Sequence, residues 1–143
     1  LEIIETTGTK ISTSTRKIKP EYNFIAIALT TSRNILYSLI DKRVDLMLKN
    51  GLEQEVKTLL KKGYSKNNPG MNSIGYGEII DYLEKKISYE KAIQLIKYRT
   101  HKLVRQQYTW LNARKFNINF IDINKNPIKI FEKIFMNFIN SKN

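Results

Sequence analysis

Apolar residues along the chain form one short unbroken run, a second segment rich in apolar residues and several stripes that repeat every three to four positions. The unbroken run covers residues 24–29 and is typical of a strand that is buried on both faces. The segment 118–123, which is apolar at 118, 120, 121 and 123, predicts a second short strand. The stripes predict helices over 33–50, 52–62, from the end of a 64–77 loop to about residue 85, over 89–113 and from 127 onward. Ser32, Ser88 and Asn126 stand where N-cap residues are expected, and Pro127 suits the first turn of a helix. We expect the stripe of the long 89–113 helix to point into the core, with these inward residues: Ile93, Ile96, Leu103, Val104, Trp110 and Leu111.

These elements predict a mainly helical fold with two short strands about ninety residues apart. Two such strands do not make a stable sheet alone, so we expect them to join strands outside this chain. The polar segment 1–23 resembles a lead-in or linker, and residues 24–143 hold the predicted elements. The chain starts at Leu1 rather than at a methionine, and we therefore expect it to be a piece of a longer protein.

The composition excludes several classes of site. The 143 residues include no cysteine and one histidine, which rules out disulfides and His-Cys metal sites within the chain. No uninterrupted apolar stretch is long enough to span a membrane, and we expect no secretory signal. We expect a cytoplasmic protein that does not bind a membrane.

The net charge of +12 has two explanations. Ile, Lys and Asn make up 21, 19 and 14 of the residues, a bias that raises the charge of a protein without any nucleic-acid partner. Between Lys91 and Ile121, however, seven Lys and Arg residues occur with no Asp or Glu. Such local clustering is the pattern expected of a surface that binds a phosphate backbone.

Two segments could carry chemistry. Arg33 follows the first strand at a helix N-terminus, a place that favours anions in open α/β sheets, although it could equally be a surface arginine. In residues 97–110, cations alternate with aromatic and glutamine side chains, a mixture that can grip unpaired bases. The same segment also fits an amphipathic helix with Trp110 in the core. We interpret His101 as a solvated helix residue and the acidic residues at 41, 45, 53 and 55 as surface ion-pair partners.

Five motifs occur in the order and spacing of one enzyme family. They are Leu1-Glu-Ile-Ile with Thr7-Gly8; Arg33 with Leu36-Tyr37, Arg43-Val-Asp and Met47-Leu48; Gly51-Leu52 with Glu55-Val56; Ile74-Gly75-Tyr76 with Glu78; and Gln107 with Thr109-Trp110-Leu111. From residue 1 to about 123 the chain resembles the C-terminal part of the tRNA dimethylallyltransferase (isopentenyltransferase) family.

The resemblance implies a P-loop-type α/β core whose parallel sheet the two strands would join. It implies transfer of a dimethylallyl group from dimethylallyl diphosphate to the N6 amine of the adenosine 3′ of the anticodon, usually with Mg²⁺. The phosphate loop and catalytic residues of the family precede anything present here, so the chain alone is expected to be inactive.

The resemblance also assigns residues. Arg33 matches the arginine that holds the diphosphate, and no catalytic or metal-binding residue is expected in this chain. The positions that match segments contacting the tRNA anticodon stem-loop are Asn72, Ser73, Gly75, Tyr76, Gly77, Lys102, Arg105, Gln106, Gln107, Thr109, Trp110 and Asn112. At Gly77, His101, Gln106 and Asn112 the family more often has a cation, which predicts weaker phosphate binding here.

Two other functions fit the residues. A non-catalytic helical RNA-binding module would use the basic helix 89–115 alone. A helical interaction domain would carry its charge only as a consequence of composition.

Overall fold

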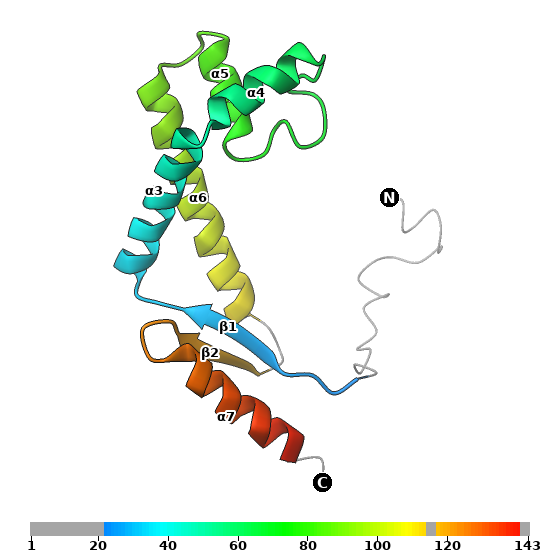
Figure 1. The fold of residues 1–143 in the computed structure, drawn as a ribbon, viewed down its shortest axis with the longest axis vertical. Coiled ribbons are helices and arrows are strands. Elements are labelled where there is room, and N and C mark those ends of the chain that lie inside the picture. Colours follow the sequence, from blue (N-terminus) through cyan, green and yellow to red (C-terminus); the bar gives the residue numbers. More distant parts are fainter. Residues whose placement is uncertain (1–21, 114–116, 141–143) are drawn as a thin grey trace.

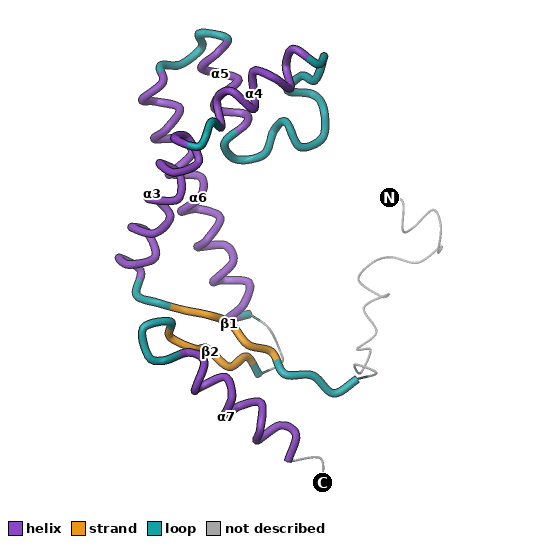
Figure 2. The backbone as a smooth tube through the Cα atoms, viewed as in Figure 1, coloured by secondary structure: helices purple, strands orange, loops and turns teal. Residues whose placement is uncertain are grey.

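A computed structural model describes residues 22–113 and 117–140. Its elements, in chain order, are β1 (Ala26–Thr30), α3 (Arg33–Lys49), α4 (Leu52–Lys61), α5 (Tyr76–Leu83), α6 (Tyr89–Asn112), β2 (Ile118–Asp122) and α7 (Pro127–Asn140). The molecule is elongated, and α3 and α6 run along it from a helical end, which holds α4 and α5, to a strand end, which holds β1, β2 and α7 (Figure 1). The same division between helix and strand is clear along the backbone tube (Figure 2).

The predicted helix boundaries are confirmed within a few residues. Ser32 caps α3 by accepting a hydrogen bond from the Ile35 amide, and Ser88 caps α6 by accepting one from the Lys91 amide. Gly51 joins α3 to α4 with a φ of 98°, which is the left-handed conformation that glycine adopts without strain. α5 begins at Tyr76, inside the segment 64–77 that the sequence analysis interpreted as a loop.

The two strands pair with each other in parallel, with Ala26 opposite Ile118 and Thr30 opposite Asp122. The first strand starts two residues later and ends one residue later than its apolar run. Beyond the strands, the Ile123 amide donates to the Thr30 carbonyl at 2.9 Å, and the Asn124 side chain donates to the Thr31 hydroxyl at 2.8 Å. These bonds hold together the two loops that follow the strands.

The core lies at the helical end. Its buried residues come from α3, α4, α5, α6 and the loop before α5: Val44, Leu52, Val56, Met71, Ile79, Ile80 and Ile96. Five segments therefore close around one apolar cluster, which is the arrangement that stabilises an independent helical unit.

The strand end is open by comparison. Its fully buried apolar residues are Ala28 and Ile121, and no residue of α7 is buried. Leu29 is 67% exposed, and the α7 rings of Phe131 and Phe135 stack on each other while remaining about half exposed. This end presents apolar surface that the described residues do not cover.

The prediction that the α6 stripe points into the core is wrong for two of its residues. Leu103 and Trp110 are 42% and 56% exposed, because the lower half of α6 diverges from α3 toward the strands (Figure 1). Ile96, in the upper half, is buried as predicted.

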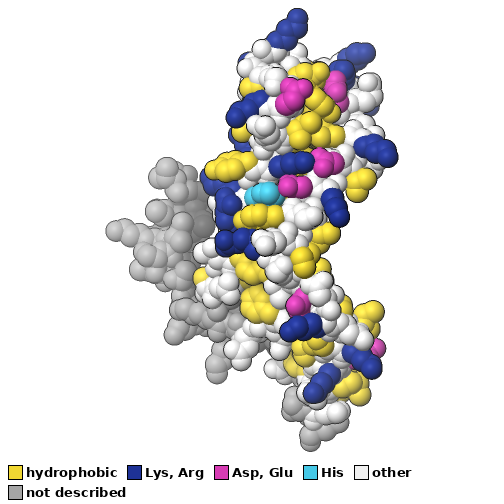
Figure 3. All heavy atoms as spheres, turned by 90° about the vertical axis from the view of Figure 1, so that its left-hand side faces the viewer, with side chains coloured by type: hydrophobic (Ala, Val, Ile, Leu, Met, Phe, Trp, Pro, Cys, Tyr) yellow, Lys and Arg dark blue, Asp and Glu magenta, His cyan; other side chains and the backbone are white. Residues whose placement is uncertain are grey.

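The charges are distributed unevenly. On the face shown in Figure 3, Lys and Arg side chains occur along the whole length, whereas Asp and Glu gather mainly over the helical end. Among the described residues, no helix combines the length and apolarity that a membrane span requires. The expected lead-in over 1–23 lies almost entirely outside the described residues.

Candidate functional site

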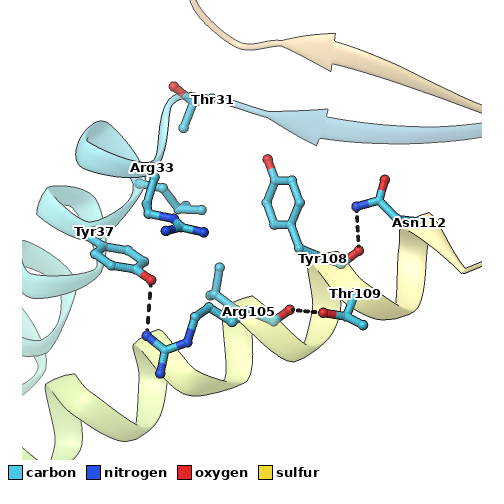
Figure 4. A pocket seen from close by; sticks show the side chains of 9 residues that line it. Thr31, Arg33, Tyr37, Arg105, Tyr108, Thr109 and Asn112 are labelled. Carbon is cyan, nitrogen blue, oxygen red and sulfur yellow. Dashed lines mark hydrogen bonds between the residues drawn. The ribbon is translucent and has the colours of Figure 1, made fainter.

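A cavity of about 430 Å³ lies where the carboxyl end of β1, the start of α3 and the lower half of α6 meet (Figure 4). Its volume is within the usual range for sites that bind small molecules, about 300–1,000 Å³. The residues that line it are Thr31, Arg33, Leu36, Tyr37, Val104, Arg105, Tyr108, Thr109 and Asn112.

Local structure places Arg33 in this cavity. β1 ends at Thr30 and Ser32 caps the helix, so Arg33 is the first residue of α3. Its guanidinium points between Tyr37 and Tyr108 (Figure 4). The unpaired backbone amides of a helix N-terminus add partial positive charge at the same place. The predicted position of Arg33, after a strand and at the start of a helix, is confirmed.

The α6 wall of the cavity is held by hydrogen bonds. The hydroxyls of Tyr108 and Thr30 bond to each other and tie α6 to β1. Arg105 Nη1 donates to the Tyr37 hydroxyl at 3.2 Å, which joins α6 to α3. Thr109 and Asn112 donate to the carbonyls of Arg105 and Tyr108, so these side-chain donors serve the helix itself (Figure 4).

Among the described residues that line the cavity, the two charged ones are both arginines and none is acidic. Thr31, Tyr37 and Tyr108 add hydroxyl groups, while Leu36 and Val104 supply apolar wall. Two guanidiniums with hydroxyl neighbours can bind an anion through charge-assisted hydrogen bonds. The site is therefore suited to a phosphate-bearing small molecule.

His101 lies next to this site and is not the solvated residue that the sequence analysis expected. Its ring stacks on Tyr37, with centroids 4.1 Å apart and planes 7° apart. Its Nε2 lies 3.0 Å from Asp41 Oδ1, and its side chain is 19% exposed. Asp41 is on α3, sixty residues earlier in the chain, so sequence neighbours could not indicate this contact.

Two of the acidic residues predicted to be surface ion-pair partners, Asp45 and Glu53, pair with lysines, and Glu55 contacts a tyrosine instead. Asp45 pairs with Lys97 at 2.7 Å, and Glu53 pairs with Lys57 at 2.6 Å. Glu55 accepts a hydrogen bond from the Tyr76 hydroxyl, which raises the pKa of Tyr76 above its ordinary value.

Apart from Lys102, the residues predicted to contact tRNA lie in three places. Arg105, Thr109 and Asn112 line the cavity with Arg33. Gln106, Gln107 and Trp110, with Leu111, line a second hollow of about 470 Å³. Lys102 is exposed and lines neither of these hollows.

The third place is the turn that carries Asn72, Ser73, Gly75, Tyr76 and Gly77. Gly75 has a φ of 103°, and a side chain there would meet the Leu52 side chain at 3.5 Å. The Asn72 amide and the Ser73 hydroxyl donate to the carbonyls of Lys66 and Gly70, at 2.6 Å each. These bonds stabilise the turn itself.

A buried glutamate fastens this turn to α6. Glu78 is 2% exposed, its Oε2 accepts from the Gly75 amide at 2.8 Å, and its Oε1 lies 2.6 Å from Arg99 Nη1. The separation of ten positions between Arg99 and Thr109 corresponds to about 15 Å along a helix. The turn and the cavity are therefore separate parts of one elongated surface.

The described residues do not fit a magnesium site. No group of three or more His, Cys, Asp or Glu side chains among them is arranged to hold a metal ion. Mg²⁺ prefers several oxygen ligands, usually with one or two carboxylates. The cavity instead offers two cations, which repel a metal ion unless it arrives with a negatively charged ligand.

Tyr37, Tyr108 and Thr31 line the cavity, although the family resemblance assigned none of them a binding role. Tyr37 lies four residues after Arg33, which places both on one face of a helix, so the spacing could have identified it. Nothing in the sequence indicates that Tyr108 bonds to Thr30, because that contact spans 78 positions.

The chain is similar to known proteins over most of its length. Residues 1–114 match the family model "IPP transferase". The tRNA dimethylallyltransferases of Thermotoga maritima and Thermoanaerobacter sp. are each 41% identical over 142 residues, covering 96% and 90% of this chain. The chain spans about half the length of these relatives, 47% and 45% respectively.

Solved structures of related transferases are also similar to this chain. The tRNA isopentenylpyrophosphate transferase of Bacillus halodurans superposes with a TM-score of 0.78 at 29% identity, covering 99% of this chain and 44% of that one. The corresponding transferase of Staphylococcus epidermidis gives the same TM-score at 27% identity. The fold, the family model and the relatives agree, and the chain belongs to the IPP transferase family of tRNA dimethylallyltransferases.

Proposed function

We propose that this chain is the part of a tRNA dimethylallyltransferase that binds the diphosphate of the prenyl donor and faces the tRNA. The complete enzyme transfers a dimethylallyl group from dimethylallyl diphosphate to the N6 amine of the adenosine 3′ of the anticodon. The observation that carries the proposal is the cavity that Arg33, at a helix N-terminus, lines together with Arg105, with no acidic residue among the described lining residues. Family membership supports the same reaction.

In this reaction the adenine amine forms a bond to the allylic carbon, the bond from that carbon to the diphosphate oxygen breaks, and the amine loses a proton. Negative charge grows on the departing diphosphate. Arg33 would stabilise that charge, since a positioned cation lowers the barrier only if it meets charge that develops in the transition state. The P-loop half of the relatives would complete the sheet beside β1 and β2 and supply the catalytic residues, and without it the chain is inactive.

Mg²⁺ belongs with that other half. The described residues lack a suitable donor set, so any magnesium would be held by the P-loop half and by the diphosphate itself. Within this chain, the reaction depends on arginines and hydroxyls.

The remaining predicted residues would face the anticodon stem-loop. Trp110, 56% exposed beside Gln106 and Gln107, provides a ring on which a base can stack and amides that can bond to base edges. Lys102 extends this surface along α6, and the turn at the helical end would add Asn72, Ser73, Gly75, Tyr76 and Gly77. Because tRNA is modified in the cytoplasm, we place the protein there.

Activity tests the diphosphate role of Arg33. A chain extended on its N-terminal side to the length of the relatives should transfer the prenyl group, and Arg33→Ala should lower turnover by about ten- to a thousand-fold. Lys133→Ala on α7 removes the same charge away from the cavity and should change turnover less than twofold. Equal turnover in the Arg33 variant would remove Arg33 from the mechanism.

Binding tests the RNA surface. An anticodon stem-loop with unpaired adenines should bind this chain more tightly than a scrambled hairpin, and its affinity should fall as salt rises. Lys102→Ala should reduce the slope of log affinity against log salt by about one, and Trp110→Ala should weaken binding about five- to a hundred-fold through lost stacking. Equal affinity for both hairpins would favour a charge that results only from composition.

A further inference from the structure

Two arginines from different helices reach the same cavity. Arg33 starts α3, and Arg105 lies in the lower half of α6, 72 positions later in the chain. The family resemblance places Arg105 with the tRNA-binding residues, but its hydrogen-bond partner is on the cavity side of α6. Figure 4 shows both guanidiniums beside Tyr37.

The ring of Tyr37 packs against His101, and the hydroxyl of Tyr37 binds Arg105. Its ring stacks on His101 at 4.1 Å, and His101 in turn lies 3.0 Å from Asp41 Oδ1. Its hydroxyl accepts the hydrogen bond from Arg105 Nη1 at 3.2 Å. A tyrosine hydroxyl that accepts a bond keeps its own hydrogen to donate, so Tyr37 can also donate to an anion beside Arg105.

The neighbouring residues on α6 face elsewhere. Gln106, Gln107 and Trp110 line the second hollow, and none of them lines the cavity of Arg33. A stem-loop that stacks on Trp110 therefore occupies a different side of α6 from Arg105. This difference separates Arg105 from Gln106, Gln107 and Trp110, whereas Thr109 and Asn112 line the cavity together with Arg105.

We infer that Arg105 binds the diphosphate together with Arg33, and that Tyr37 is a positioning residue that holds Arg105 at the cavity. The inference rests on the proposed function and adds to it a second diphosphate-binding residue. A diphosphate has two phosphoryl groups, and two guanidiniums from separate helices can each bind one of them in the bidentate way that arginine favours. A single phosphate can occupy only part of this arrangement, so the site discriminates between diphosphate and phosphate.

The first experiment titrates inorganic diphosphate and inorganic phosphate into the 143-residue chain without magnesium, by calorimetry. We expect diphosphate to bind more tightly than phosphate. Arg33→Ala and Arg105→Ala should each weaken diphosphate binding about ten- to a hundred-fold, the range for losing a hydrogen bond between charged groups. Lys133→Ala controls for the loss of one positive charge and should change the affinity less than twofold.

The second experiment tests positioning. Tyr37→Phe keeps the stacked ring but removes the hydroxyl, and it should weaken diphosphate binding about two- to ten-fold. In the Arg105→Ala background the same change should have a much smaller effect, because the hydroxyl acts through Arg105. Tyr98→Phe, an exposed tyrosine of α6 that does not line the cavity, is the matched control.

Circular dichroism checks that each variant folds. Arg105→Lys keeps the positive charge but loses the planar guanidinium, so it should bind diphosphate with intermediate affinity. If Arg105→Ala binds diphosphate as the wild type does while Arg33→Ala does not, the inference is wrong and the proposed function stands. If Arg105→Ala loses stem-loop affinity instead, Arg105 belongs to the RNA surface. If the wild-type chain binds no diphosphate at millimolar concentrations, the two-arginine site is wrong, whereas prenyl transfer by the extended chain still decides the proposed function.

Discussion

The two ends of this molecule differ in how much of their apolar surface is buried. At the helical end, α3, α4, α5, α6 and the loop before α5 enclose seven buried apolar residues. At the strand end, two parallel strands and α7 leave Leu29, Ile128 and Met136 between 54% and 70% exposed. The helical end has a closed core, and the strand end has an apolar surface of the kind that marks a contact with further protein.

The comparison explains where the candidate site lies. The Arg33–Arg105 cavity sits at the boundary, where α3 and α6 leave the closed core and reach the strands. Side chains anchored by the helical end thus extend toward the open end. In a complete transferase, the partner of the open sheet would meet the diphosphate at this boundary.

The largest expected contrast is in core stability. Ile79 is fully buried on α5, and Ile79→Ala should lower the free energy of unfolding by about 2–5 kcal/mol. Phe131→Ala on α7 removes a larger side chain, yet that side chain is 45% exposed, so we expect less than about 1.5 kcal/mol. Urea denaturation followed by circular dichroism measures both, and equal losses would show that the strand end also has a closed core.

The buried glutamate should give the next largest effect. Glu78→Gln keeps the shape of the side chain but weakens the hydrogen bond from the Gly75 amide and removes the ion pair with Arg99, and we expect a loss of about 1–3 kcal/mol in the free energy of unfolding. Arg99 is about half exposed, so water can solvate its charge and the loss stays below that of a fully buried pair. Glu84→Gln, an exposed residue that pairs with Lys86, should cost less than about 0.5 kcal/mol in the same urea experiment. Similar losses for the two variants would mean that Glu78 does not fasten the turn.

Sequence alone predicted the elements but only part of their packing. Ser32 and Ser88 marked the starts of α3 and α6 because capping is a local interaction between neighbours in the chain. The exposure of Trp110 was not predictable in the same way, since a helical stripe indicates an apolar face but not how far along the helix its neighbour continues. α6 keeps its apolar stripe after α3 has diverged from it.

In the site, too, interactions between neighbours in the chain were predictable, and contacts between distant segments were not. The position of Arg33 could be predicted because the strand, the cap and the arginine are adjacent in the chain. The contacts of Arg105 with Tyr37 and of His101 with Asp41 join α3 to α6 across 68 and 60 positions, and only the packing of the two helices brings them together. Sequence therefore identified Arg33 on one wall of the cavity. It assigned Arg105, Thr109 and Asn112, which line the other wall, to tRNA rather than to this cavity.

A smaller effect should follow from cutting the tie between the two ends. Tyr108→Phe removes the hydroxyl that bonds to Thr30, and we expect a loss of about 0.5–1.5 kcal/mol at the strand end. Amide hydrogen exchange measures this locally, and β1 amides should exchange faster while Ile79 and Ile80 at the helical end keep their protection. Tyr98→Phe is the control on the same helix. Faster exchange at both ends would show that the molecule opens as one unit rather than as two.

The smallest expected effect concerns the pH dependence of the helical end. Hydrogen bonds from its own backbone amide and from the Ser88 hydroxyl hold the pKa of Glu90 below its ordinary value of 4.5. A carboxylate whose pKa is lower in the folded state stabilises that state above the unfolded pKa, and this contribution disappears as pH falls through the folded pKa. Glu90→Gln should therefore be less stable than the wild type at pH 6, and the difference should shrink steadily below about pH 4.5. Thermal melts of both proteins from pH 6 to pH 3 measure the difference, and a gap that stays constant over this range would mean that the Glu90 carboxylate gives the start of α6 no pH-dependent support.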